Sequence, residues 1–472
     1  MKRSSKHISL AVILGVSLFL FSCKKEFLSV VPPTSLTPEQ ALSTEADLQV
    51  ALRGAYQGLR TGVTSYTADM YGRSIPILGD LLADNTYQST QNTNRYTLHN
   101  NFTFNVTDGN SMGIWSGCYS VILRTNNIIN SAIASNANVD QYKGEAHAIR
   151  ALAYFTLIRF FSRPYTDAPT GQGVPIITTY DPSAKPGRSS IAEVYTLIND
   201  DLNKAYSLLT KFTNSSQFNK YAAKALHAKV YLTMGDLANA RTAALDVINN
   251  GGFSPLTTAN HAGYWANSAI TTSKLETIFE VSSDAVGNLS FDALSYLYSQ
   301  AGNYGDMLCA DDLYALYEAG DVRRALYPTG TRGGLPSVFI NKYPVITGDV
   351  SDTKVLRLSE MYLIAAEASL PANETDARTY VNFVTSRRGA SPITSTGSQL
   401  LEDIIRERRK ELAFEGDRYF DLMRLKRTVQ RSTNYPATAR SITYDNYRRI
   451  LPIPQIETDA NPTIKGQQNP GY

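Results

Sequence analysis

The chain has 472 residues, of which 43% are hydrophobic and 18% charged, a composition typical of a folded globular protein. Its 45 basic and 42 acidic residues nearly balance, so charge favours neither nucleic acid nor an anionic membrane surface as a partner. Five His and three Cys residues are scattered without the spacing of a zinc, haem or iron–sulfur site, and no Gly-rich nucleotide loop is present. We therefore expect no metal and no cofactor.

The first thirty residues predict a lipoprotein signal peptide over residues 1–22. A basic start precedes an apolar run over residues 8–21, which is too short to cross the hydrocarbon of a bilayer. Ser22 then stands before Cys23 as in a bacterial lipobox, so we expect Cys23 to be acylated and to anchor the chain stably. An ordinary signal peptide with a chance Cys is the alternative. Loss of residues 1–22 leaves 42 basic and 42 acidic residues.

The next segment, residues 23–38, contains three prolines and predicts an extended tether between the anchor and the folded body. From Glu39 onward apolar and small residues recur at helical spacing. Ala41 to Leu59 outlines a first helix. Trp115 to Ile129 outlines a second, with Asp108, Asn110 or Ser111 available to cap it.

Helices then recur in pairs, most clearly over Tyr221 to Asn250, where small residues flank a Gly-Asp turn as in a tetratricopeptide repeat. Looser pairs and one long helix complete the pattern: Glu145–Phe161 with Ile191–Leu209, Val355–Leu370 with Asp376–Arg388, and a helix over Gln399–Arg427. We therefore predict a mostly α fold, a tetratricopeptide-like scaffold of about four helix pairs with long loop-rich insertions and minor β-structure.

Two long polar insertions interrupt this scaffold. Thr61–Gly109 is dense in Tyr, Thr, Asn and Gln, and Gly251–Gly348 mixes short strand-like runs with turns. Sugars are bound by aromatic faces and by amide, carboxylate or Arg groups that replace water at the hydroxyls, and both kinds of group are present here. The candidate ligand-binding residues are Tyr66, Tyr71, Asn85, Tyr87 and Tyr96 from the first insertion and Trp265, Tyr296 and Tyr304 from the second. Packing is the alternative role for each of them.

A hydrolase interpretation stays open, because residues 109–113 spell G-x-S-x-G. Ser111 would then be the nucleophile, with His147, His227 or His261 as base, but no strand–helix alternation follows. A helix cap explains the same residues. The sequence would also suit a glycosidase, which needs a pair of carboxylates, or a purely structural surface lipoprotein. Cys118 and Cys309 could form a disulfide, although Cys118 sits in a helical pattern that favours a buried thiol.

Several motifs resemble the SusD/RagB family of outer-membrane lipoproteins of Bacteroidetes, nearly from end to end. The most specific is RERRKELAFEGDRYFDL within Ile404–Leu425, followed by LRLSEMYLI at 356–364 and by Cys23 with its following Phe-Leu. The family often has Trp at Tyr419 and Asp at Ser29. The charges of the first motif are balanced, so we expect it to pack or to contact a partner rather than to touch cargo.

The resemblance implies a fold of four tetratricopeptide-like helix pairs, divided here into a region over 39–250 and one over 251–472. It also implies a lipid-anchored protein at the surface of the outer membrane that acts as a lid on a SusC-like TonB-dependent transporter. Such proteins bind oligosaccharides, or peptides in some branches, without cleaving them, so no catalytic residue is expected. The ligand residues of the family cannot be transferred, because its binding loops share no motif.

Overall fold

The computed structural model describes residues 41–63, 69–267, 269–301, 304–370 and 372–472. The predicted signal peptide, Cys23 and the tether lie outside the described residues, and so does Tyr66 of the first insertion. In the part of the chain that is described, no helix is both long enough and apolar enough to span a bilayer.

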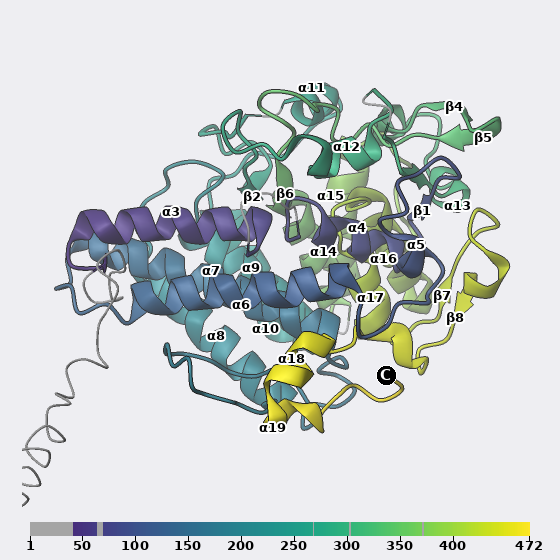
Figure 1. Cartoon of the computed structure of the whole chain (residues 1–472). Helices are drawn as coiled ribbons and strands as arrows, with labels where there is room; N and C mark the ends of the chain where they lie inside the picture. The colour runs from purple at the N-terminus through teal and green to yellow at the C-terminus, as the bar shows by residue number, and fades with distance from the viewer. Residues whose placement is uncertain (1–40, 64–68, 268, 302–303, 371) are drawn as a thin grey trace, which may run out of the picture.

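Long helices that follow one another in the chain pack side by side and form the body of the molecule (Figure 1). Their bounds are α3 (Glu45–Thr61), α6 (Gly109–Ile129), α7 (Ala137–Phe161), α8 (Ile191–Leu208), α9 (Lys220–Met234), α10 (Leu237–Asn250), α14 (Leu358–Ser369), α15 (Glu374–Arg387) and α16 (Gly397–Glu411). Shorter helices lie between them: α4 (Ser74–Leu81), α5 (Thr97–Asn100), α11 (His261–Ala266), α12 (Leu294–Tyr298), α13 (Asp311–Tyr314), α17 (Arg418–Arg424), α18 (Gln455–Ala460) and α19 (Pro462–Lys465).

The expected helix pairs are confirmed as α7 with α8, α9 with α10, and α14 with α15, and α3 packs against α6 as a further pair. Gly235 ends α9 in the left-handed conformation at φ 78°, which lets the chain turn at once into α10. Asp108 caps α6, since its carboxylate accepts the Ser111 N–H. The mostly helical architecture therefore follows the sequence pattern.

The prediction of one long helix over Gln399–Arg427 is wrong in one respect, because the chain forms two helices there, α16 and α17. Phe414 and Gly416 between them have φ of 67° and 84°, in the left-handed region that ends a helix. The Gly416 N–H donates to the buried Asp80 carboxylate at 2.7 Å, which fixes the break against α4. The periodicity continues through the break, so the sequence pattern alone did not reveal it.

The β-structure is small. Much of it lies in the insertions, as expected, but residues 353–357, 429–430 and 441–442 form strands outside them. An antiparallel sheet of order β1-β3-β5-β4 joins the first insertion to the second, and β2 pairs with β6. The strand bounds are β1 (Thr86–Gln88), β2 (Thr277–Val281), β3 (Met307–Cys309), β4 (Thr329–Arg332), β5 (Leu335–Val338), β6 (Thr353–Arg357), β7 (Val429–Gln430) and β8 (Ser441–Ile442). The first of these sheets brings loops far apart in sequence to one end of the molecule.

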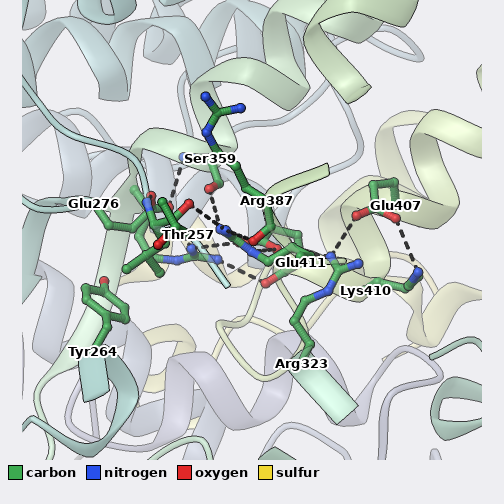
Figure 2. A network of polar contacts seen from close by, with 12 residues as sticks. Thr257, Tyr264, Glu276, Arg323, Ser359, Arg387, Glu407, Lys410 and Glu411 are labelled. Atoms are coloured by element: carbon green, nitrogen blue, oxygen red, sulfur yellow. Dashed lines mark hydrogen bonds and ion pairs between the residues drawn. The ribbon is translucent and has the colours of Figure 1, made fainter. Parts of the chain in front are cut away.

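The motif over Ile404–Leu425 belongs to a buried ionic network. Figure 2 shows Glu411 at its centre, with Arg323 on one side and Glu276 on the other. Glu411 carboxylate oxygens accept from Arg388 Nη2 and Arg357 Nη1 at 2.8 and 2.9 Å. Burial by itself would raise the pKa of Glu411, but the surrounding guanidiniums outweigh it and hold this pKa well below its usual range. These residues therefore hold the fold and offer no surface to cargo.

Candidate functional site

Phe291, Tyr296 and Tyr304 form an aromatic cluster, here called the aromatic platform. Tyr296 belongs to α12, which Figure 1 shows on the same side of the molecule as the β4–β5 hairpin, and the Tyr304 carbonyl accepts from Arg332 of β4. The Phe291 and Tyr304 rings stack with centroids 5.6 Å apart and planes 23° apart. Tyr296 meets both rings edge-on at 5.2 and 5.8 Å and is itself buried. Phe291 is 54% exposed, so the platform has a firm base and an open upper ring.

Arg95, from the first insertion, borders the platform on one side. Its guanidinium carbon lies 5.6 Å from the Tyr304 ring centroid, and its Nη1 donates to Asp292 at 2.8 Å and to the Phe291 carbonyl at 3.3 Å. Arg73 Nη1 also reaches Asp292 at 2.7 Å. Arg73 Nη2 also lies 3.7 Å from Asp69, so the two guanidiniums meet two carboxylates, and Arg95 is the arginine that lies against the Tyr304 ring.

Arg332, at the end of β4, also contacts the platform residues. Its Nη1 donates to Gln300 Oε1 at 2.9 Å, and its Nη2 donates to the Gln91 carbonyl at 2.9 Å and to the Tyr304 carbonyl. Among the residues that the structure describes, no acidic side chain lies within ion-pair distance of Arg332. The platform therefore has a second guanidinium beside it, and this one is held by neutral groups, among them the Gln300 side-chain amide.

An exposed aromatic face flanked by guanidinium and amide donors matches the chemistry that binds a sugar. The ring face stacks on the C–H groups of a pyranose, and the polar donors replace the water that leaves its hydroxyls. The donors are held by the sheet and by one another before any ligand arrives, so little conformational entropy is lost on binding. Nothing in this arrangement resembles a general acid–base pair placed over a reacting bond.

The structure brings some of the sequence-predicted residues to this site. Tyr296 and Tyr304 are two of its three rings. Tyr96 lies beneath it with no exposed surface, and its hydroxyl accepts from Arg73 Nε at 2.9 Å, so it positions the arginine that holds Asp292. In this conformation Tyr96 supports the platform and has no face to offer a ligand.

The remaining described candidates lie elsewhere and are packed into the protein. Tyr71 pairs with Thr156 at 3.0 Å, and Asn85 donates to Asp80 at 2.6 Å. The rings of Tyr87 and Trp265 are also buried, the first against Tyr435 and the second under Lys342 and Arg357. Burial therefore gives these four residues packing roles in this structure.

Sequence reasoning missed Phe291, Arg95 and Arg332. The only local signal for Phe291 is that it is an aromatic residue in the polar segment Asn-Leu-Ser-Phe-Asp. Many other aromatic residues of the insertions have the same kind of surroundings, so this signal does not single it out. The two arginines carry no signal at all, because each reaches the site through a partner distant in sequence. These residues come together because the four-stranded sheet joins the two insertions in the folded protein.

The hydrolase alternative places its nucleophile at Ser111, which is 1% exposed. The Ser111 hydroxyl donates to Asp108 Oδ2 at 2.6 Å at the start of α6, as a helix cap does. The histidine near this pair is His99, whose Nε2 lies 3.1 Å from the same carboxylate. It was not among the bases that the sequence suggested. The serine therefore bonds to an acid rather than to an imidazole and has no access for a substrate.

The described residues contain no group of three or more His, Cys, Asp or Glu side chains arranged to hold a metal ion. Cys118 and Cys309 are free and buried, so the buried thiol expected at Cys118 is confirmed. Burial raises the pKa of both thiols, which keeps them protonated and unreactive.

Comparisons with known proteins cover nearly the whole chain. A family described as "SusD family" matches residues 310–472, and one described as "Starch-binding associating with outer membrane" matches residues 26–232. SusD-like protein P2 of Formosa agariphila is 28% identical, and the alignment covers 93% of this chain and 95% of that protein.

Solved structures agree with this. A SusD superfamily protein of Bacteroides thetaiotaomicron is 31% identical with a TM-score of 0.82, covering 90% of this chain and all of that one. A SusD-like carbohydrate binding protein of Bacteroides vulgatus, at 22% identity, shares the fold with a TM-score of 0.78 over 90% of this chain and 98% of its own.

Proposed function

Because the chain belongs to the SusD family, we propose that it captures an oligosaccharide at the cell surface and delivers it to a SusC-like TonB-dependent outer-membrane transporter. Capture would take place on the aromatic platform, and the protein would release its cargo without cleaving it. Anchoring through an acylated Cys23 would keep it at the outer membrane. The family match to a starch-binding description over residues 26–232 supports a glycan as cargo.

The observation that carries this proposal is the open Phe291–Tyr304 stack with Arg95 and Arg332 beside it. An aromatic ring that remains half exposed in a folded protein loses part of the stabilisation that burial would give it. Binding of an apolar sugar face would recover that stabilisation. The flanking guanidiniums supply hydrogen bonds that fix the orientation of the sugar.

The first test is binding of the chain that starts after Cys23 to a panel of plant, host and microbial glycans, by affinity electrophoresis and calorimetry. We expect one glycan class to bind without release of reducing ends. Tyr304→Ala should weaken this binding about tenfold or more, because it removes a central stacking ring. Tyr314→Ala is the matched control, since Tyr314 packs against Arg324 in a similar pair outside the platform.

Two results would contradict the proposal. Binding that is equally strong in Tyr304→Ala would remove the platform from the site. If no glycan bound and peptides bound saturably, the cargo would be a peptide and not a glycan. The lid role would then be tested with peptide cargo.

Anchoring and partnership are tested in the cell. Cys23→Ala should shift the protein from the membrane fraction to the soluble fraction, because two acyl chains bind a bilayer far more strongly than none. The wild-type chain should co-purify with a transporter barrel from detergent-solubilised outer membranes. Retention of Cys23→Ala in the membrane would contradict the anchor, and absence of any barrel would favour a purely structural surface protein.

A further inference from the structure

A concave site lies at the other end of the molecule from the aromatic platform. A cavity of about 380 Å³ opens between α6, residues 175–186 and α18–α19, here called the α6 groove. Figure 1 shows α18 and α19 far from α12 and the β4–β5 hairpin, so the groove is not part of the platform. Its volume lies in the range of small-molecule sites. Its lining is mainly apolar and aromatic, and includes Trp115, Tyr119, Ile122, Ile177 and Tyr180.

One wall of the groove, the segment that contains Pro175 and Ile177, is fastened to the scaffold by side chains. The Tyr119 hydroxyl donates to the Pro175 carbonyl at 2.9 Å, and Asn126 Nδ2 donates to the Ile177 carbonyl at 2.9 Å. The Tyr154 hydroxyl contacts the backbone of the same Ile177 as donor and as acceptor. This segment has no regular secondary structure, yet its backbone is held in place.

The opposite wall is fastened as well. Asn461, between α18 and α19, donates from Nδ2 to the Pro186 carbonyl at 2.8 Å. Arg188 binds the carbonyl of Gln467 and the side chain of Asn469, both at 2.8 Å. Both walls are therefore ordered before a ligand arrives, so binding loses little conformational entropy in the protein.

The carboxylate that lies next to the aromatic rings of the groove, Glu457, has no counterion among the described residues. Glu457 Oε2 accepts from Trp115 Nε1 at 3.2 Å, and among the described residues no basic side chain lies within 4 Å of Glu457. The Trp115 and Tyr119 rings lie beside each other with centroids 5.1 Å apart. A carboxylate next to aromatic faces in a partly apolar site attracts an organic cation, both by charge and through the rings.

The rim of the groove adds little net charge. Asp181 and Lys185 both line it and are exposed, and the Asp181 carboxylate accepts from the backbone and hydroxyl of Ser183. Opposite charges at the rim largely cancel. Tyr180 is 55% exposed and adds an aromatic face at the mouth. Arg188 carries a further positive charge near Tyr119, but it does not line the groove and is held by carbonyl and side-chain amide oxygens. Glu457 is therefore the charged group that lines the groove beside the Trp115 ring.

We propose that the α6 groove is a second binding site, for an amphipathic ligand that carries an ammonium group. Its apolar body would lie against Tyr119, Ile177 and Tyr180, and its ammonium would pair with Glu457. The ligand could be a free arylalkyl amine or the amino terminus of a peptide, since both present the same group on an apolar body. The groove is separate from glycan capture and does not depend on it.

Intrinsic fluorescence provides the test, because Trp115 and Trp265 are the chain's two tryptophans. In Trp265→Phe the remaining emission reports on the groove. We expect a saturable change in Trp115 emission with phenethylamine, about tenfold weaker binding of the neutral 2-phenylethanol, and weaker binding still of 3-phenylpropionate. A phenylalanyl-glycine amide distinguishes the sources: binding as tight as the free amine indicates a peptide, and weaker binding indicates a free amine.

Glu457→Gln should abolish the preference for the amine, since the amide can still accept from Trp115 but has no charge. Asp459→Asn is the matched control, because it removes the same charge from an exposed residue of the same helix that does not line the groove. Calorimetry on the wild-type chain repeats the comparison without the Trp265 substitution, and Tyr304→Ala should bind phenethylamine as the wild type does.

Three results would overturn the proposal. The first is equal affinity for the amine and the alcohol. The second is an amine preference that survives in Glu457→Gln. The third is the absence of saturable binding in wild-type calorimetry up to about 10 mM phenethylamine, a concentration beyond which an affinity has little meaning for a specific site. None of them bears on glycan binding at the platform.

Discussion

Glu411 shows how a single residue holds this protein together. Its carboxylate pairs with Arg388, Arg357 and Arg323 at 2.8 to 3.0 Å, and all four side chains are buried. Charges taken out of water are costly unless each is paired and hydrogen-bonded. Removing the central acid would leave three guanidiniums without their shared partner.

We therefore expect Glu411→Gln to lower the free energy of unfolding by about 3–5 kcal/mol, the range for breaking a buried ion pair from one side. Urea denaturation followed by circular dichroism measures it. Glu402→Gln on the same helix is the control, because Glu402 pairs with Arg427 at the surface and such pairs contribute about 1 kcal/mol or less. Equal losses in the two variants would contradict the central role of Glu411.

At the scale of elements, the break between α16 and α17 depends on one close approach. A Cβ added to Gly416 would lie 2.7 Å from Pro76 Cα, and this Cα belongs to the backbone of α4 and cannot turn away. The positive φ of Gly416 adds strain for any other residue. The break thus docks α4, the residues after α16 and the Asp80 carboxylate together.

Gly416→Ala should for this reason destabilise the protein by more than the left-handed backbone alone would, which is about 1–2 kcal/mol. Gly334→Ala separates the two effects, because Gly334 also has a positive φ of 77° but its Cβ would meet open space. Thermal melts of both variants give the comparison. A Gly416→Ala melt no lower than that of Gly334→Ala would show that α4 can move aside.

The whole molecule carries buried acids that should set its behaviour at low pH. Burial would raise the pKa of Asp84, but Arg409 and Arg418 outweigh it and lower this pKa to about 2. Asp421 reaches about 2 in the same way beside Arg408 and Arg424. The ordinary pKa of an unfolded aspartate is near 4, so both groups stabilise the folded state above that pH.

The free energy of unfolding should accordingly fall steeply as the pH drops from about 4 to 2. In this interval Asp84 and Asp421 bind protons in the unfolded chain but stay ionised in the folded protein. Denaturation at stepped pH values measures the loss. Asp84→Asn, although less stable at neutral pH, should lose less over this interval, since one of the depressed carboxyls is gone. An equal loss in the variant would contradict the assignment.

Above pH 4 two sets of buried groups oppose each other. Burial lowers the pKa of His227 to about 4, so protonation of the unfolded chain costs stability as the pH falls below 6.5. Burial raises the pKa of Asp80 and of Glu145 to about 7, which favours the folded state over the same interval. The steep loss of stability below about pH 4 is therefore assigned to the ion-paired residues Asp84 and Asp421.

The sequence by itself determined the helical scaffold, because helix formation depends on patterns that repeat every three or four residues and on local caps. The helices of the α9–α10 pair, the Gly235 turn and the Asp108 cap are all short-range features. The motif over Ile404–Leu425 also identified the family, since it is long and specific.

Only the tertiary structure decided which aromatic residues are exposed. Tyr71, Tyr96 and Tyr304 stand in similar polar surroundings along the chain, yet the first two are buried and only Tyr304 reaches the platform. Their exposure depends on which distant segment covers each ring, as when Arg73 caps Tyr96. Such contacts join residues that lie far apart in the sequence, and the periodicity of the sequence carries no information about them.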